Sequence, residues 1–205
     1  LLLVSSLMTS VDAKETRKKP KLPRPSTSEL EDVRIDSDSM TILYGNSLAE
    51  RLQEEGTFEA LLHAAAAEKK QQFRSMAYTG DQVHFRIRAS KFGRHMAYLA
   101  SQWQADRVIM FFGMNESFAG EKGVNRFKKQ LTSYLSLIKT RHPNSTYVLV
   151  SPTAVEPGHS PQLPNADERN LDLQLYSEAM KDIAGQQGVS FVDLFQSSKE
   201  LYKQS

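Results

Sequence analysis

Three short polar loops carry the residue types of an acyl-transfer site, and each places a polar side chain beside a glycine. The loops are Gly45-Asn46-Ser47, Thr79-Gly80-Asp81 and Gly113-Met114-Asn115. A serine at the first turn of a helix lies near free backbone N–H groups, which stabilise negative charge. The Gly80 N–H and the Asn115 amide are donors of the kind that hold an oxyanion. Each loop alone is equally explained as a turn or a helix cap.

The elements that must position these loops alternate between strand-length apolar runs and amphipathic helical stretches. The predicted strands are Met40–Tyr44, Phe73–Tyr78, Arg107–Phe112, Tyr147–Val150 and Ser190–Leu194. The predicted helices are Leu48–Lys70 with a break at Gly56, Asp81–Ala89, Arg94–Trp103, Val124–Lys139 and Leu171–Gln187. This alternation predicts an α/β fold, a three-layer αβα sandwich with a five-stranded parallel sheet of flavodoxin-like type. The three loops should then converge beyond the carboxyl ends of the strands.

The order and spacing of the three loops resemble the SGNH (GDSL-like) hydrolase family over roughly Met40 to Phe195. The resemblance implies that Ser47 is the nucleophile, with the Ser47 and Gly80 N–H groups and the Asn115 side chain as oxyanion donors. Asn46 and Gly113 would support them. It also implies an exported serine esterase that acts on small esters or acetylated carbohydrates. The stretches GNSLAERL, TGDQV and GMNESFAG are also similar to SGNH-like domains in large exported proteins of planctomycete-type bacteria, which carry further modules.

Two departures from the family pattern concern the partner of the serine. Asn46 stands where the family usually has an aspartate, so it brings no charge to hold a histidinium. After the last predicted strand the chain reads Asp193-x-x-Gln196 where a D-x-x-H block is expected. We expect the sequence to stop before that block, with the catalytic histidine beyond Ser205. The alternative is a non-catalytic SGNH-fold binding module in a larger envelope protein.

Histidines and carboxylates elsewhere in the chain give weaker candidates. His159 lies in the long proline-rich loop between Ser151 and Asn170 and is the reserve candidate for a general base. The remaining histidines are expected on the surface or in packing; they are His63, His84, His95 and His142. Glu116 and Glu156 are expected to be solvated loop carboxylates. No pair has metal-ligand spacing, so we predict no metal and no cofactor.

The composition excludes several classes of function. The chain contains no cysteine, which excludes disulfides, thiolate zinc sites and a cysteine nucleophile. Its 26 basic and 24 acidic residues are mixed along most of the sequence and give a net charge of +2. Without a broad basic face, nucleic acid is not an expected partner. The expected partner is a small-molecule or carbohydrate ester.

The N-terminal region predicts export. Residues 1–13 form an apolar run that resembles the end of a signal peptide and is too short for stable membrane insertion. We therefore expect a periplasmic or extracellular location. Residues 14–35 form a basic, proline-rich linker, and residues 36–205 form the hydrolase-like domain. A third alternative is an unrelated α/β domain, because the loop residues are common turn formers.

Overall fold

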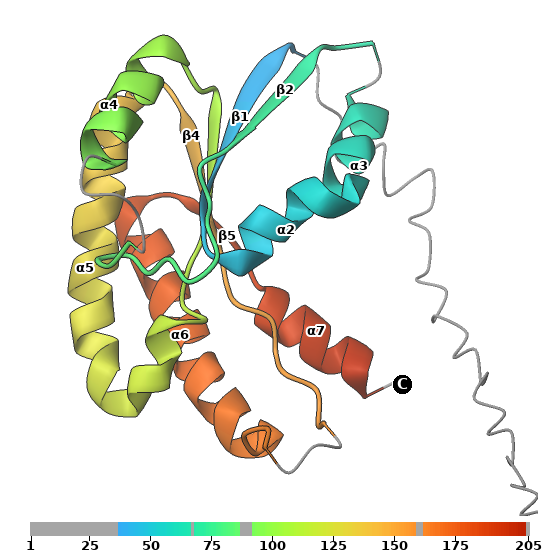
Figure 1. The fold of residues 1–205 in the computed structure, drawn as a ribbon, viewed down its shortest axis with the longest axis vertical. Helices are drawn as coiled ribbons and strands as arrows, with labels where there is room; N and C mark the ends of the chain where they lie inside the picture. The colour runs from blue at the N-terminus through green and yellow to red at the C-terminus, as the bar shows by residue number, and fades with distance from the viewer. Residues whose placement is uncertain (1–36, 67, 87–91, 159–161, 204–205) are drawn as a thin grey trace, which may run out of the picture.

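The computed structural model describes residues 37–66, 68–86, 92–158 and 162–203 (Figure 1). The predicted signal peptide, the linker and His159 lie outside these ranges. The strands are β1 (Ser39–Gly45), β2 (Gln71–Ser75), β3 (Arg107–Phe111), β4 (Thr146–Val150) and β5 (Ser190–Val192). The helices are α2 (Ser47–Glu55), α3 (Thr57–Ala65), α4 (Phe92–Gln102), the 3-10 helix η1 (Glu116–Ala119), α5 (Gly120–Arg141), α6 (Ala166–Gln187) and α7 (Leu194–Tyr202).

The strands form one parallel sheet in the order β2-β1-β3-β4-β5. β1 pairs with β2 on one side and with β3 on the other. The order in which strands are added to the sheet therefore reverses at β1. Because the strands are parallel, their carboxyl ends lie at the same edge of the sheet, and the loops after β1, β2 and β3 begin at that edge. The predicted five-stranded parallel sheet is confirmed.

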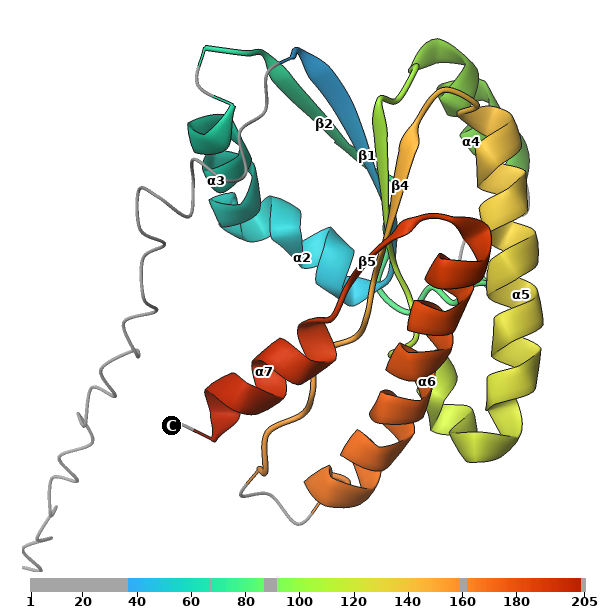
Figure 2. The ribbon, with the colours of Figure 1, turned by 180° about the vertical axis from the view of Figure 1, so that it is seen from behind.

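Helices cover both faces of the sheet. Figures 1 and 2 show α4, α5 and α6 on one face and α2, α3 and α7 on the other. Side chains of β3 alternate between the two layers, since Val108 and Met110 pack toward α5 and α6 while Ile109 and Phe111 pack toward α2. The predicted three-layer sandwich is therefore confirmed. Within the described ranges, no helix combines the length and apolar character needed to cross a membrane.

The predicted helix at Asp81–Ala89 is wrong over its described part, because residues 81–86 form a loop. Asp81 pairs with Arg86 at 3.6 Å, and the Val83 N–H donates 2.7 Å to the Glu116 carboxylate. The Gln82 N–H donates 2.9 Å to the Phe85 carbonyl, which is the reverse of the helical hydrogen-bond direction. Residues 76–78, predicted as strand, also lie in the loop after β2.

The end of the chain contains a helix that the sequence pattern did not predict. β5 ends at Val192, and Leu194, predicted as strand, is the first residue of α7. The Asp193 carboxylate caps this helix by accepting the Gln196 N–H at 2.9 Å. Asp193 therefore has a structural role here.

Candidate functional site

The nucleophile loop joins β1 directly to α2. Asn46 is the N-cap of α2: its side chain accepts the Leu48 N–H at 3.2 Å, and its own N–H donates 3.2 Å to the Phe111 carbonyl. Ser47 is the first helical residue, and its hydroxyl makes no hydrogen bond within the described part of the chain. The helix-cap explanation therefore applies to Asn46 and leaves the Ser47 hydroxyl unused.

Ser47 lines a cavity of about 200 Å³, named here the Ser47 cavity. Phe111, Met114 and Pro152 form apolar walls, and Arg51, one turn along α2, adds a cation. The volume suits a short acyl chain better than a long one. Among the described residues, no histidine lines the Ser47 cavity, so none of the described lining side chains is a general base for the hydroxyl.

The second loop is fixed on both sides of Gly80. The Thr79 N–H and hydroxyl donate 2.6 and 2.5 Å to the Glu50 carboxylate on α2, and the Asn115 side chain donates 3.0 Å to the Asp81 carbonyl. Gly80 has φ +83°, a conformation that favours glycine. Its N–H donates no hydrogen bond within the described residues. Gly80 thus offers a free backbone donor in a loop that two neighbours hold.

The third loop brings Gly113 and Asn115 beside the second. The Asn115 amide has two N–H bonds, and the bond to Asp81 uses one of them, which leaves one donor without a partner among the described residues. Gly113 has φ +96°, and its N–H donates 2.9 Å to Glu116. A side chain at Gly113 would start 3.2 Å from Pro152 and 3.3 Å from Met180. The backbone conformation therefore favours glycine there, and a larger residue would also crowd Pro152 and Met180.

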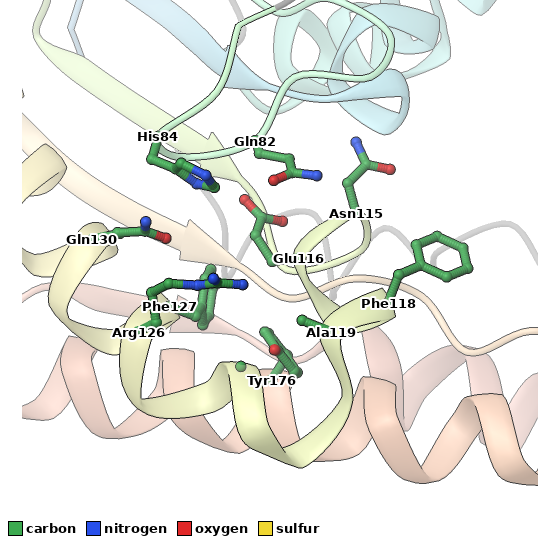
Figure 3. A pocket seen from close by; sticks show the side chains of 11 residues that line it. Gln82, His84, Asn115, Glu116, Phe118, Ala119, Arg126, Phe127, Gln130 and Tyr176 are labelled. Atoms are coloured by element: carbon green, nitrogen blue, oxygen red, sulfur yellow. The ribbon is translucent and has the colours of Figure 1, made fainter.

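Ser47, Gly80 and Asn115 lie in loops bonded to one another, but they do not line one cavity. Neither Gly80 nor Asn115 lines the Ser47 cavity, whereas Met114, beside Asn115 in the chain, does. Asn115 lines a second cavity of about 260 Å³, named here the Asn115 cavity (Figure 3). The third loop is therefore a wall shared by the two cavities.

Glu116 was expected to be a solvated carboxylate, and the structure shows that this is wrong. Its side chain is 6% exposed and accepts the Val83 N–H at 2.7 Å and the Gly113 N–H at 2.9 Å. Burial raises the pKa of Glu116, while the two backbone donors and nearby Arg86 oppose that rise. Glu116 thus joins the second loop to the third, because one carboxylate oxygen accepts the Val83 N–H and the other accepts the Gly113 N–H.

Two arginines, Arg169 buried and Arg86 partly buried, complete the support of these loops, and the sequence pattern did not indicate either. Arg169 on α6 is 7% exposed and donates 2.8 Å to the Met114 carbonyl and 2.5 Å to the Ser117 hydroxyl. The Arg86 guanidinium lies 5.2 Å from the Phe112 ring centroid and 4.8 Å from that of Tyr134. Nothing in the local sequence separates these arginines from solvated ones, because their partners lie far along the chain.

The histidines take different positions. His63 on α3 and His95 on α4 are exposed, and His142 is buried with its ring 3.0 Å from the Tyr44 hydroxyl. His84, in the loop once predicted as helix, has D-x-x-H spacing from Asp81, but it is exposed and lines the Asn115 cavity. Among the described residues, no group of three or more His, Asp or Glu side chains could hold a metal.

Replacing Glu116 by glutamine is expected to lower the free energy of unfolding by about 1–3 kcal/mol. The amide oxygen can accept one of the two backbone N–H groups, but the NH₂ group then faces the other N–H. Urea unfolding at neutral pH measures the loss. Glu121→Gln, at an exposed residue in the first turn of α5, is the matched control and should stay within about 0.5 kcal/mol of wild type. Equal losses of unfolding free energy in the two variants would contradict a stabilising role for the two hydrogen bonds to Glu116.

The same pair of variants gives a pH dependence with a defined sign. Because burial raises the pKa of Glu116 in the folded protein, the native state binds its proton more tightly than the unfolded chain. Wild-type stability from this group is greatest below the unfolded pKa of about 4.3 and falls as pH rises through the raised value. Glutamine does not titrate, so the difference in unfolding free energy between wild type and Glu116→Gln should become smaller as the pH rises through that pKa. A deficit that widens would contradict the raised pKa.

Comparison with known proteins agrees with this fold. The profile of the GDSL-like lipase/acylhydrolase family matches residues 38–204. The acetylxylan esterase Axe2 from Geobacillus stearothermophilus has 18% identity and a TM-score of 0.61, with 83% of this chain and 82% of Axe2 covered.

Two further solved structures share the fold at low identity. LAE5, an alpha/beta hydrolase enzyme from the metagenome of Lake Arreo in Spain, has 15% identity and a TM-score of 0.60, with 82% of each chain covered. An extracellular lipase from Streptomyces rimosus has 17% identity and a TM-score of 0.52, with 77% of this chain and 81% of the lipase covered. A search of curated proteins gave no match. From the extent of the family match, this chain belongs to the GDSL-like lipase/acylhydrolase family.

Proposed function

We propose that this protein is a serine ester hydrolase in which Ser47 is the nucleophile. The observation that carries the proposal is the unbonded Ser47 hydroxyl, which stands at the start of α2 and lines a cavity of about 200 Å³. A neighbouring asparagine already caps the helix, so the hydroxyl has no structural duty among the described residues. Free N–H donors on the adjoining loops add the electrostatic part of an acyl-transfer site.

The reaction follows from these groups. The Ser47 oxygen attacks the ester carbonyl carbon, and the carbonyl oxygen becomes an oxyanion that accepts bonds from the Ser47 N–H, the Gly80 N–H and the free N–H of Asn115. Collapse of this intermediate breaks the bond to the alcohol and leaves an acyl-serine, which water then hydrolyses to the acid. We assign the general base to a histidine outside the described residues, which takes the serine proton and gives it to the departing alcohol. The same base then takes a proton from the attacking water and returns it to the Ser47 oxygen.

The substrate we propose is a short acyl ester, in particular an acetylated carbohydrate. The small apolar Ser47 cavity supports a short acyl group. The likeness to Axe2, whose name describes an acetylxylan esterase, supports a carbohydrate alcohol.

We also propose that the domain is exported as part of a larger protein. The apolar run of residues 1–13 and the basic, proline-rich stretch that follows support a signal peptide and a linker. The similarity of GNSLAERL and GMNESFAG to SGNH-like domains of planctomycete-type exported proteins supports the same conclusion.

The test of the proposed function is covalent labelling together with ester hydrolysis. The full-length protein is incubated with a fluorophosphonate probe, and the modified residue is identified by mass spectrometry. Hydrolysis of short-chain p-nitrophenyl esters is measured in parallel. Labelling at Ser47 and turnover of the acetate ester are the expected results. A folded full-length protein that is neither labelled nor active would instead be a non-catalytic binding module.

Asn115→Ala is expected to lower kcat for p-nitrophenyl acetate by about 10²–10³, because one oxyanion donor is lost. Fluorophosphonate should still label Ser47, only more slowly, since the nucleophile remains. Asn125→Ala, at an exposed residue of α5, is the control and should keep wild-type kcat. If kcat of Asn115→Ala stays within about twofold of wild type, Asn115 is not an oxyanion donor.

A further inference from the structure

Apart from Asn115, the residues that line the Asn115 cavity have no part in the proposed acyl-transfer chemistry. Figure 3 shows Gln82 and Asn115 on one side of it and Arg126 and Tyr176 on the other, with Phe118 at the rim. Its volume of about 260 Å³ approaches the lower end of small-molecule sites. Because the third loop separates it from the Ser47 cavity, a group bound here would lie next to an ester that reacts at Ser47.

The cavity contains a cation without an ion-pair partner among the described residues. Arg126 on α5 has no ion-pair partner among the described residues, and Figure 3 shows its side chain extending across the cavity. Glu116 is the acidic residue of the lining, and each of its oxygens already accepts a backbone N–H. A guanidinium with a free fork of donors matches the two oxygens of a carboxylate.

Neutral amides and the exposed ring of Phe118 supply further contacts for a ligand, and His84, Phe127 and Tyr176 also line the cavity. The side chains of Gln82 and Gln130 make no hydrogen bond within the described residues, so each offers two donors and an acceptor to hydroxyl groups. Phe118 is 70% exposed, and the Arg169 guanidinium lies 4.0 Å from its ring centroid. The apolar face of a sugar could pack against this exposed ring, which the arginine holds in position.

We propose that the Asn115 cavity is the subsite for the alcohol part of the substrate and that it binds a sugar unit carrying a carboxylate, a uronic acid. This inference rests on the proposed function for the placement of the ester and on the cavity itself for the ligand. A phosphate is a poorer match, because phosphate sites gather several cations or backbone donors. Here the lining has a single arginine beside uncharged amides, and Glu116 adds a carboxylate that would repel the higher charge of a phosphate more strongly.

The test compares methyl β-D-glucuronide with methyl β-D-glucoside, which differ in a carboxylate or a CH₂OH group at one carbon. Binding to the full-length protein carrying Ser47→Ala is measured by NMR titration, so that no turnover is needed. The glucuronide is expected to bind at least about tenfold more tightly. Arg126→Gln should reduce the preference to about twofold or less, whereas Lys122→Gln, an exposed residue of the same helix, should keep it.

Three results would overturn the subsite: equal binding of the two glycosides, a preference that survives Arg126→Gln, or inorganic phosphate competing as strongly as the glucuronide. The outcome is independent of the proposed hydrolysis. Selective glucuronide binding in a protein without esterase activity upholds the subsite and removes the catalytic proposal. Hydrolysis of neutral acetates without any glucuronide preference upholds the catalytic proposal and removes the subsite.

Discussion

Ser47→Ala is expected to abolish fluorophosphonate labelling and to lower kcat for p-nitrophenyl acetate by a factor of about 10⁴ or more. The methyl group that replaces the hydroxyl cannot form the acyl intermediate, so the remaining oxyanion donors give only residual catalysis. Stability should hardly change, because the hydroxyl makes no hydrogen bond within the described residues and Asn46 caps the helix. The unfolding free energy is expected to stay within about 0.5 kcal/mol of wild type.

The control for this experiment is Ser136→Ala on α5. That serine hydroxyl donates 3.0 Å to the Thr132 carbonyl on an exposed helix surface, and its loss should leave labelling and kcat unchanged. Circular dichroism and urea unfolding of both variants establish that each is folded. If Ser47→Ala keeps more than about a tenth of wild-type kcat, or if the probe labels another serine, Ser47 is not the nucleophile.

Gly45→Ala is expected to lower the free energy of unfolding by about 3 kcal/mol or more. Gly45 ends β1 with φ +148°, and an added Cβ would lie 2.8 Å from Phe111 Cβ and overlap the Phe111 carbonyl oxygen. That oxygen accepts the Asn46 N–H, so neither strand can shift without breaking the bond that places the nucleophile loop. Activity should fall together with stability.

Gly185→Ala gives a control of opposite sign. Gly185 lies within α6, and nothing stands within 4 Å of an added Cβ. Alanine is the better helix former, so this variant should gain up to about 1 kcal/mol. Urea unfolding of both variants measures the contrast. If Gly45→Ala lowers the free energy of unfolding by less than about 1 kcal/mol, the close approach of β1 and β3 does not require glycine at position 45.

The sheet and the three loops could be predicted because their signals are local. A short apolar run such as Arg107–Phe112 is typical of a buried parallel strand, and a glycine after it marks the turn. The parallel arrangement then places Ser47, Gly80 and Asn115 in loops at one edge. The roles of these residues remain predictions, and the structure adds that Ser47 and Asn115 line different cavities.

Residues whose partners lie far along the chain could not be predicted. The apolar spacing of 81–89 suits a helix, but the bond from the Val83 N–H to distant Glu116 helps to hold residues 81–86 as a loop. Glu116 and Arg169 are buried by tertiary partners, whereas single charged residues in loops and on helices are usually solvated. Asp193 was included in a strand, although an aspartate before an amphipathic stretch is also a cap signal that would have found α7.

The pairing of β1 with β3 also dictates an order of assembly during synthesis. The Asn46 N–H bonds to the Phe111 carbonyl, so the chain from residue 46 to residue 111 must be made before the start of α2 has its anchor. β2, although earlier in sequence than β3, pairs on the opposite side of β1 and cannot substitute for it. A nascent chain that ends before Phe111 therefore has only the contacts from the β2 side to hold this loop, and the bond to the Asn46 N–H forms only when the third strand joins the first.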